Sequence, residues 1–101
     1  MNVITERRLR EAAHEHPAAA KKIQHWNLVA RSAIWDNLDE ARKSFPHADP
    51  VKVRSGKTVT VFNLSNDFRL ITAIHYNRKR IYILDVLTHA EYDKNKWKER
   101  L

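Results

Sequence analysis

The residue types near the end of the chain could together perform acid–base chemistry on a phosphate. The run Thr88-His89-Ala90-Glu91 has the pattern of a capping box, which predicts a helix that begins at His89. Tyr92 lies three residues further on and shares a helix face with His89. A helix N-terminus favours an anion, and an imidazole and a phenol can both exchange protons there. The spacing is equally compatible with a packed Tyr92 and a solvated His89.

A guanidinium group is expected on the strand that precedes this helix. Alternation along Phe68–Tyr76 places Arg69 on one face, together with Ile71, Ala73 and His75. The opposite face carries bulky apolar side chains and should pack on helices, so Arg69 would project from the uncovered face. There its rigid fork of donors would suit a phosphate, although an arginine that merely flanks a turn is the alternative. We interpret His75 as a neutral filler rather than a nucleotide contact.

The histidines do not predict a metal site. His14 and His16 are two positions apart, and residues at that spacing on a helix do not face each other. The chain has no H-E-x-x-H motif, and its other four histidines lack ligand spacing. We therefore expect no metal and no cofactor.

Composition removes several classes of function. With a single glycine, neither a dinucleotide-binding nor a P-loop motif can be written, and the G-x-S-x-G motif of hydrolases is also absent. The absence of cysteine excludes disulfide scaffolds, iron–sulfur ligation and a thiol nucleophile. The length of 101 residues predicts a single domain, 1–101. No apolar stretch approaches the roughly 20 residues of a membrane helix, and the chain is charged from Glu6 onward, so we expect a soluble, cytoplasmic protein without a membrane partner.

The positive charge is concentrated in the second half of the chain. Residues 1–50 carry eight basic and seven acidic groups, a net charge of +1, whereas residues 51–101 carry eleven and five, a net charge of +6. This asymmetry favours a polyanionic partner such as nucleic acid over a basic surface that only aids solubility.

The first half has helical periodicity. Thr5 is predicted to cap a helix that ends before Pro17, and Pro17 then opens a second helix with Ile23 and Trp26 on its apolar face. Asp36 is predicted to cap a third, short helix.

The second half has strand periodicity. Strands are expected at 3–4, 51–53, 58–64, 68–76 and 80–87, and short turns link the last four. Such turns require an antiparallel meander. The sequence therefore predicts an α+β fold, in which two to three N-terminal helices pack on one face of a small antiparallel sheet and a short C-terminal helix follows.

The motifs of this half resemble those of the HigB toxin family. Phe68–Tyr76 (F-R-L-I-T-A-I-H-Y) and Thr88–Lys94 (T-H-A-E-Y-D-K) match in order and spacing, as do Val61–Leu64 (V-F-N-L) and the preceding Ala48–Val51. The resemblance implies a RelE-like fold and a toxin of a type II toxin–antitoxin system. Such toxins are mRNA interferases that cut messages on the ribosome. The implied partner is a HigA-type helix-turn-helix antitoxin, through which alone the toxin would reach operator DNA.

The resemblance also assigns roles to residues. Arg69 fits the arginine of the RelE-like active site, Tyr92 the tyrosine near the C-terminus, and His89 the histidine of the T-H-x-E-Y-D motif. RNA can be cleaved without metal when its own 2′-OH attacks the adjacent phosphate, which needs a base, a cation and an acid. Arg69 would hold the phosphate while His89 and Tyr92 share the proton transfers, in an order that the sequence leaves open. The lysines that relatives place in the strand before this arginine are absent, and the nearest lysine is Lys57.

Basic residues of the second half are expected to bind the RNA backbone. They are Lys52, Arg54, Lys57, Arg78 and Arg80. The main alternative to an endoribonuclease is a non-catalytic basic module that binds RNA or the ribosome. A co-repressor that binds DNA is disfavoured, because the helical half contains no helix-turn-helix pattern.

Overall fold

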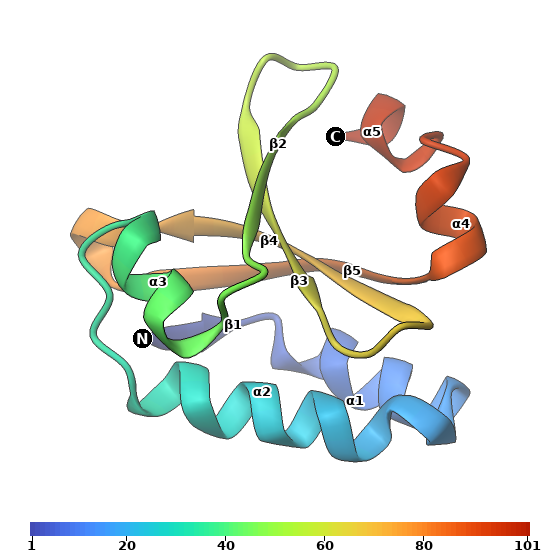
Figure 1. The fold of residues 1–101 in the computed structure, drawn as a ribbon, viewed down its shortest axis with the longest axis horizontal. Coiled ribbons are helices and arrows are strands. Elements are labelled where there is room, and N and C mark those ends of the chain that lie inside the picture. Colours follow the sequence, from blue (N-terminus) through green and yellow to red (C-terminus); the bar gives the residue numbers. More distant parts are fainter.

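Helices and one five-stranded sheet make up the α+β fold that the computed structural model describes for residues 1–101 (Figure 1). The helices are α1 (Glu6–Glu15), α2 (Ala20–Ser32), α3 (Leu38–Ser44), α4 (His89–Asp93) and α5 (Trp97–Arg100), with 3₁₀ turns at Pro17–Ala19 and Tyr76–Arg78. The strands are β1 (Asn2–Ile4), β2 (Asp49–Lys52), β3 (Thr58–Asn63), β4 (Phe68–His75) and β5 (Arg80–Thr88). None of the helices has the length and apolar character needed to cross a membrane.

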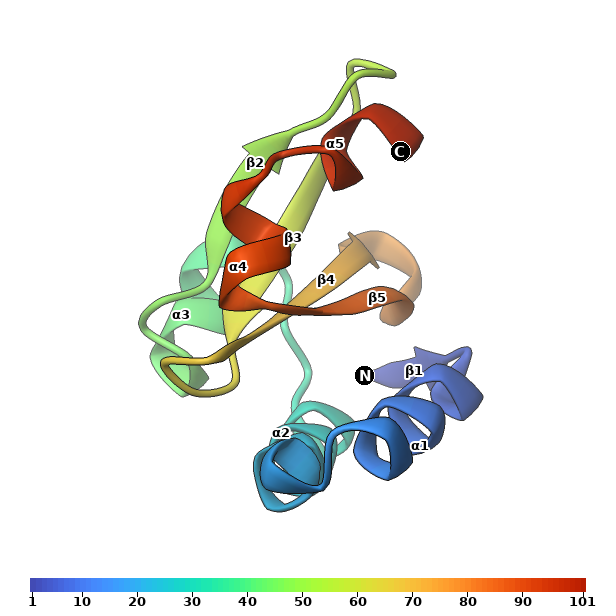
Figure 2. The same ribbon diagram turned by 90° about the vertical axis from the view of Figure 1, so that its right-hand side faces the viewer.

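The sheet has the strand order β1-β5-β4-β3-β2. Strands β2 to β5 form the antiparallel meander that the short turns predict. The prediction of a wholly antiparallel sheet is wrong at one edge, because β1 pairs in parallel with β5, with Val3 opposite Ile81. This pairing places the first strand of the chain beside the last one, so β1 forms one edge of the sheet. The helices α1 and α2 follow β1 along the chain (Figure 2).

The helix starts differ from the predicted signals at three places. Thr5 precedes α1, but its backbone is left-handed with φ of 64° and its side chain makes no capping hydrogen bond to the helix. Pro17 opens a 3₁₀ turn, and α2 begins only at Ala20.

Asn37, not Asp36, caps α3, because the Asn37 side chain accepts a hydrogen bond from the Glu40 backbone N–H at 3.0 Å. Asp36 instead pairs with Lys79. The capping box at Thr88 is confirmed, and α4 begins at His89.

The C-terminal helix is divided into two short pieces. Asn95 adopts a left-handed backbone conformation with φ of 61°, which asparagine tolerates better than most residues. The chain therefore turns between α4 and α5, and α5 folds back toward the β2–β3 hairpin, where the Arg54 backbone N–H donates to the Lys98 carbonyl at 3.0 Å (Figure 2).

Apolar side chains are buried on both faces of the sheet. On one face, α1, α2 and α3 cover a cluster of 16 buried residues, which includes the rings of Trp26, Trp35 and Phe62. The partly buried ring of Phe45 packs against all three. On the other face, Trp97 of α5 closes a cluster of six, which also includes Val53, Val59, Val61, Ile71 and Leu87. The second face is thus partly covered by the C-terminal helices, and only its remainder is open.

Candidate active site

Arg69 lies on the sheet face that the N-terminal helices do not cover, as its position in β4 predicts. Its neighbour Leu70 is buried in the helix-side cluster, whereas Ile71 is buried in the cluster under α5. In register, Arg69 stands between Asn63 of β3 and Leu87 of β5. The arginine is therefore central in the sheet and half-buried.

The turn between β3 and β4 holds the Arg69 guanidinium in place. Nη1 donates to the carbonyls of Ser65 at 2.8 Å and Phe68 at 3.1 Å. These contacts use the donors of one nitrogen, while Nη2 points toward α4. The guanidinium is thus oriented before any substrate arrives, which reduces the entropy lost on binding.

The structure brings the three predicted catalytic side chains together. The Nδ1 atom of His89 lies 3.5 Å from Nη2 of Arg69, and the Arg69 Cζ atom lies 5.9 Å from the centre of the Tyr92 ring. The capping box makes this possible, because it starts α4 directly at the end of β5, the strand paired with Arg69.

Both ring nitrogens of His89 have partners. Nε2 lies 3.2 Å from the Oδ2 atom of Asp93, one helical turn further on. With a carboxylate at Nε2 and a guanidinium donor at Nδ1, the neutral imidazole carries its proton on Nε2. The backbone N–H of His89 donates to the Asp67 carbonyl at 2.7 Å, so it is not free for the anion that the helix start suggests.

Tyr92 is held by packing against α5. Its ring stacks on that of Trp97 with centroids 5.3 Å apart, and the Trp97 indole N–H donates to the Tyr92 carbonyl at 3.0 Å. Burial raises the pKa of the Tyr92 phenol, and the negative charge of Asp49 raises that pKa further, while Arg69 acts in the opposite direction. At neutral pH, the Tyr92 phenol is therefore protonated.

An open depression of about 340 Å³ adjoins this group and contains residues that the sequence argument missed. Arg69 and Tyr92 line it, and the remaining polar side chains come from α3, the loop before β2, the start of β2, and β3: Arg42, His47, Asp49 and Asn63. The register of the β3–β4 hairpin would have identified Asn63, since it is directly opposite Arg69. No motif in the sequence around Asp49 predicts that this residue lies beside Tyr92.

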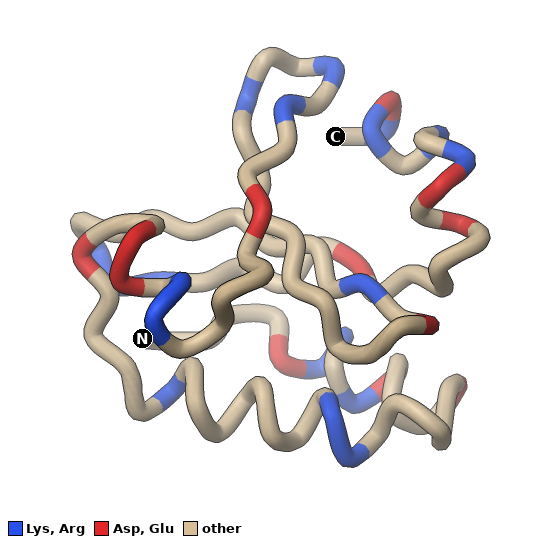
Figure 3. Tube along the Cα trace, in the orientation of Figure 1, with Lys and Arg blue, Asp and Glu red and all other residues tan.

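The five basic residues expected to bind RNA fall into two groups (Figure 3). Lys52, Arg54 and Lys57 lie on the β2–β3 hairpin beside α5, which adds further basic residues. Arg78 and Arg80 lie at the opposite end of the β4–β5 hairpin, where Arg80 pairs with His75. Six positions of β4 separate that pair from Arg69, about 20 Å at strand spacing. The structure therefore does not bring Arg78 and Arg80 close to Arg69.

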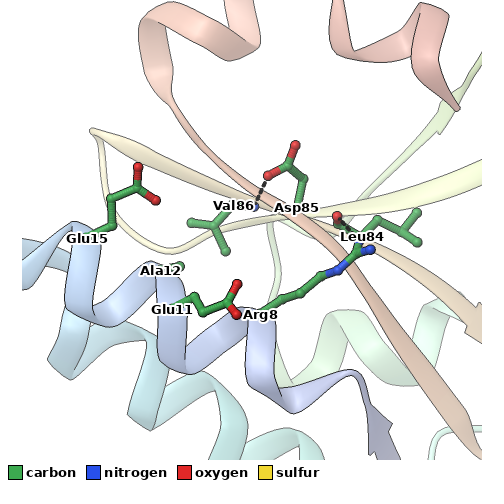
Figure 4. A pocket seen from close by; sticks show the side chains of 7 residues that line it. All are labelled: Arg8, Glu11, Ala12, Glu15, Leu84, Asp85 and Val86. Carbon is green, nitrogen blue, oxygen red and sulfur yellow. Dashed lines mark hydrogen bonds between the residues drawn. The ribbon is translucent and has the colours of Figure 1, made fainter.

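A second depression, between α1 and β5, does not resemble a phosphate site. Its lining includes the carboxylates of Glu11, Glu15 and Asp85 (Figure 4). Arg8 is directed at the backbone there and donates to the Leu84 carbonyl at 2.6 Å, at the irregularity in the β4–β5 pairing. No group of three or more potential metal ligands lies together anywhere in the molecule.

Comparison with known proteins shows the family of this fold. The model of the HigB toxin family, described as the RelE-like toxic component of a toxin–antitoxin system, matches residues 19–95. A relative from Escherichia coli O6:H1 (strain CFT073), named mRNA interferase HigB, is 29% identical over 94 residues, which cover 93% of this chain and 90% of the relative. Relatives from Escherichia coli K12, named mRNA interferase toxin HigB, and from Shigella flexneri are 26% identical, over 92% of this chain and 88% of each relative.

The family match covers about three quarters of the chain and includes the strand with Arg69 and the helix with His89 and Tyr92. The chain is thus a RelE-like toxin of a toxin–antitoxin system. It belongs to the HigB toxin family.

Proposed function

We propose that this toxin is an mRNA interferase, an endoribonuclease that stops growth by cutting translated messages. The observation that carries the proposal is the contact of Arg69 with both His89 and Tyr92 at the rim of an open depression. A cation, a proton acceptor and a proton donor thereby meet at one point. The names of the relatives, mRNA interferase HigB, support the same reaction.

The reaction requires no metal in this scheme. The ribose 2′-oxygen forms a bond to the adjacent phosphorus, and the bond from phosphorus to the 5′-oxygen of the next nucleotide breaks. One product ends in a 2′,3′-cyclic phosphate and the other begins with a 5′-hydroxyl. A base removes the 2′-proton, and an acid supplies a proton to the departing 5′-oxygen.

Arg69 binds the phosphate through Nη2 and stabilises the charge that develops on its oxygens. Because Nη1 is held by backbone carbonyls, the guanidinium needs little reorganisation when the phosphate binds. Nη2 leaves His89 for the phosphate in this step, and that movement frees Nδ1 of His89.

His89 is the base, and Asp93 is its positioning residue. Asp93 keeps the proton on Nε2, so Nδ1 has the lone pair that accepts the 2′-proton. Asp93→Asn would favour the other tautomer and should lower kcat about tenfold with KM unchanged. Asp93→Glu, which keeps an acceptor, should recover part of the rate in the same turnover assay, whereas an equal loss in both variants would contradict this role.

Tyr92 is the acid. Its raised pKa keeps the phenol protonated, which suits proton donation rather than abstraction. After each cleavage, the proton gained by His89 and the proton lost by Tyr92 exchange with water, which restores the starting state.

The substrate and partner complete the proposal. We place the reaction in the cytoplasm, on mRNA held by the ribosome, where the basic hairpin at Lys52, Arg54 and Lys57 binds the RNA backbone. A HigA-type antitoxin neutralises the toxin and is its only connection to operator DNA. These statements follow from the family resemblance, and the basic surface is consistent with them.

Induced expression in bacteria tests the proposal. The wild type should arrest growth and produce new mRNA 5′ ends within translated codons. Arg69→Ala, Tyr92→Phe and His89→Gln should abolish both effects, while His14→Gln, a matched change at an exposed position on α1, should abolish neither. Growth arrest without cuts, or arrest that survives all three substitutions, would instead support a non-catalytic module that blocks the ribosome.

A further inference from the structure

The depression beside the reacting group contains polar side chains without partners. Neither Asp49 nor Asn63 takes part in a side-chain hydrogen bond or an ion pair within the chain, although both line the depression together with Arg69 and Tyr92. The loop before β2 is held in place, since Arg42 Nε donates to the Ala48 carbonyl at 2.9 Å. The depression therefore has a fixed wall and unused hydrogen-bonding groups.

Asp49 is unexpected at this location. The chain carries a net charge of +7, and its active site is expected to bind an anionic polymer. A carboxylate in the same depression as Arg69 repels the phosphates that Arg69 attracts. This repulsion applies to every RNA. A carboxylate can offset it for some RNAs, because it accepts hydrogen bonds from bases that carry an amino group.

The register places Asp49 and Asn63 around one point. Asp49 pairs with Val61 of β3, and Asn63 lies two residues further along the same strand, so all three side chains are on the face that carries Arg69. Tyr92 lines the same space. A base joined to the phosphate on Arg69 would thus meet a carboxylate and an amide at its edge, and an aromatic ring near its plane.

We propose that Asp49 and Asn63 form a nucleobase subsite that selects a base with an exocyclic amino group next to the cleaved bond. The Asp49 carboxylate accepts from the amino group, and the Asn63 amide contacts the neighbouring ring position. Uracil presents a carbonyl oxygen where cytosine presents its amino group, so the carboxylate would meet a second acceptor. This inference rests on the proposed nuclease activity, because it assigns a preference to that reaction.

Matched RNAs test the subsite. The probes are messages that differ only in cytosine or uracil at one position of the cut codon, given both free and bound to translating ribosomes. The wild type should cut the cytosine form about tenfold faster, the size expected for one hydrogen bond made or lost. Asp49→Asn offers a donor as well as an acceptor and should bring the two rates to within about twofold. Glu15→Gln makes the same charge change on α1 and should keep the wild-type ratio.

The outcomes separate the subsite from the nuclease. Equal cutting of the two messages by the wild type at every position of the codon, or an Asp49→Asn variant that slows both equally, would overturn the subsite and leave the nuclease standing. Equal slowing of both messages would show that Asp49 affects cleavage only through its charge, which raises the pKa of the Tyr92 phenol. Failure of the wild type to cut any message would overturn both. Asn63→Ala provides a second variant, on another strand, and should also reduce the ratio.

Discussion

The two faces of the sheet divide stability and chemistry between them. On one face, three helices cover a cluster of 16 buried residues that includes three aromatic rings. On the other, α5 closes a cluster of only six, and the remaining space holds Arg69, Tyr92 and the open depression. Because the larger core does not depend on the polar face, the second face can keep an uncompensated carboxylate and an oriented guanidinium. Substitutions on the two faces should therefore have different consequences.

The largest expected effect on folding is on the helix-covered face. Phe62 is 1% exposed and contacts the rings of Trp26, Trp35 and Phe45. Phe62→Ala should lower the free energy of unfolding by about 3–5 kcal/mol, because the cavity cannot be refilled. Denaturant unfolding measures this change. A loss below about 1 kcal/mol would contradict the assignment of stability to this face.

On the other face, Arg69→Ala should reduce cleavage by about 10²–10³-fold, the cost of removing one preorganised donor to developing charge. Its effect on unfolding should stay near 1 kcal/mol, since the loss is limited to hydrogen bonds of the β3–β4 turn. Unfolding and cleavage are measured on the same preparation. A variant that unfolds as easily as Phe62→Ala would remove the distinction between the faces.

Two tyrosines provide a matched comparison across the sheet. Burial is the main cause that raises the pKa of both Tyr76, which packs on the helix-side cluster, and Tyr92. In the unfolded chain each phenol loses its proton near pH 10, whereas in the folded chain it keeps the proton to higher pH. The free energy of unfolding should therefore fall as the pH rises above 10. Ultraviolet titration of tyrosinate should therefore show two groups ionising above pH 10.

Substitution of the two tyrosines should affect RNA cleavage differently. Tyr92→Phe should lose cleavage by about 10²-fold or more, whereas Tyr76→Phe should remain within about twofold of the wild type. Equal losses in the two variants would assign the effect of Tyr92 to packing rather than to proton donation.

The smallest expected effect compares the two basic groups. The double change Arg54→Ala with Lys57→Ala should make the plot of log K for RNA binding against log salt concentration less steep. The slope should fall by about 0.7 for each phosphate that the variant no longer neutralises. The matched pair Arg78→Ala with Arg80→Ala lies at the far end of the sheet and should have less effect on RNA that occupies the site. RNA binding measured over a series of salt concentrations distinguishes the two double variants. A larger change in slope for Arg78→Ala with Arg80→Ala would show that the RNA backbone lies along the β4–β5 turn instead.

Local signals were sufficient for much of this architecture. The capping box at Thr88 fixed the start of α4, and alternation along β4 fixed the face of Arg69. Helix spacing placed Tyr92 on the same face as His89, whereas the grouping of Arg69 with these two residues came from the resemblance to the HigB family.

Features that depend on distant contacts could not be predicted in this way. The strand β1 has three residues, and its partner strand β5 begins only after 75 residues of intervening chain. Similarly, Asp49 reaches Tyr92 only through the β2–β3 pairing, and α5 covers the second face only because Asn95 reverses the chain. No window of sequence around these residues contains that information.

The central claim is that a ribose 2′-hydroxyl attacks the phosphate held by Arg69, and a single substitution in the RNA tests it. A message that carries one 2′-deoxynucleotide at a mapped cut site should resist cleavage there and remain cut at unmodified sites. The unmodified RNA should yield a 2′,3′-cyclic phosphate and a 5′-hydroxyl. Cleavage that continues at the deoxynucleotide, or products with a 5′-phosphate, would contradict the mechanism assigned to Arg69, His89 and Tyr92.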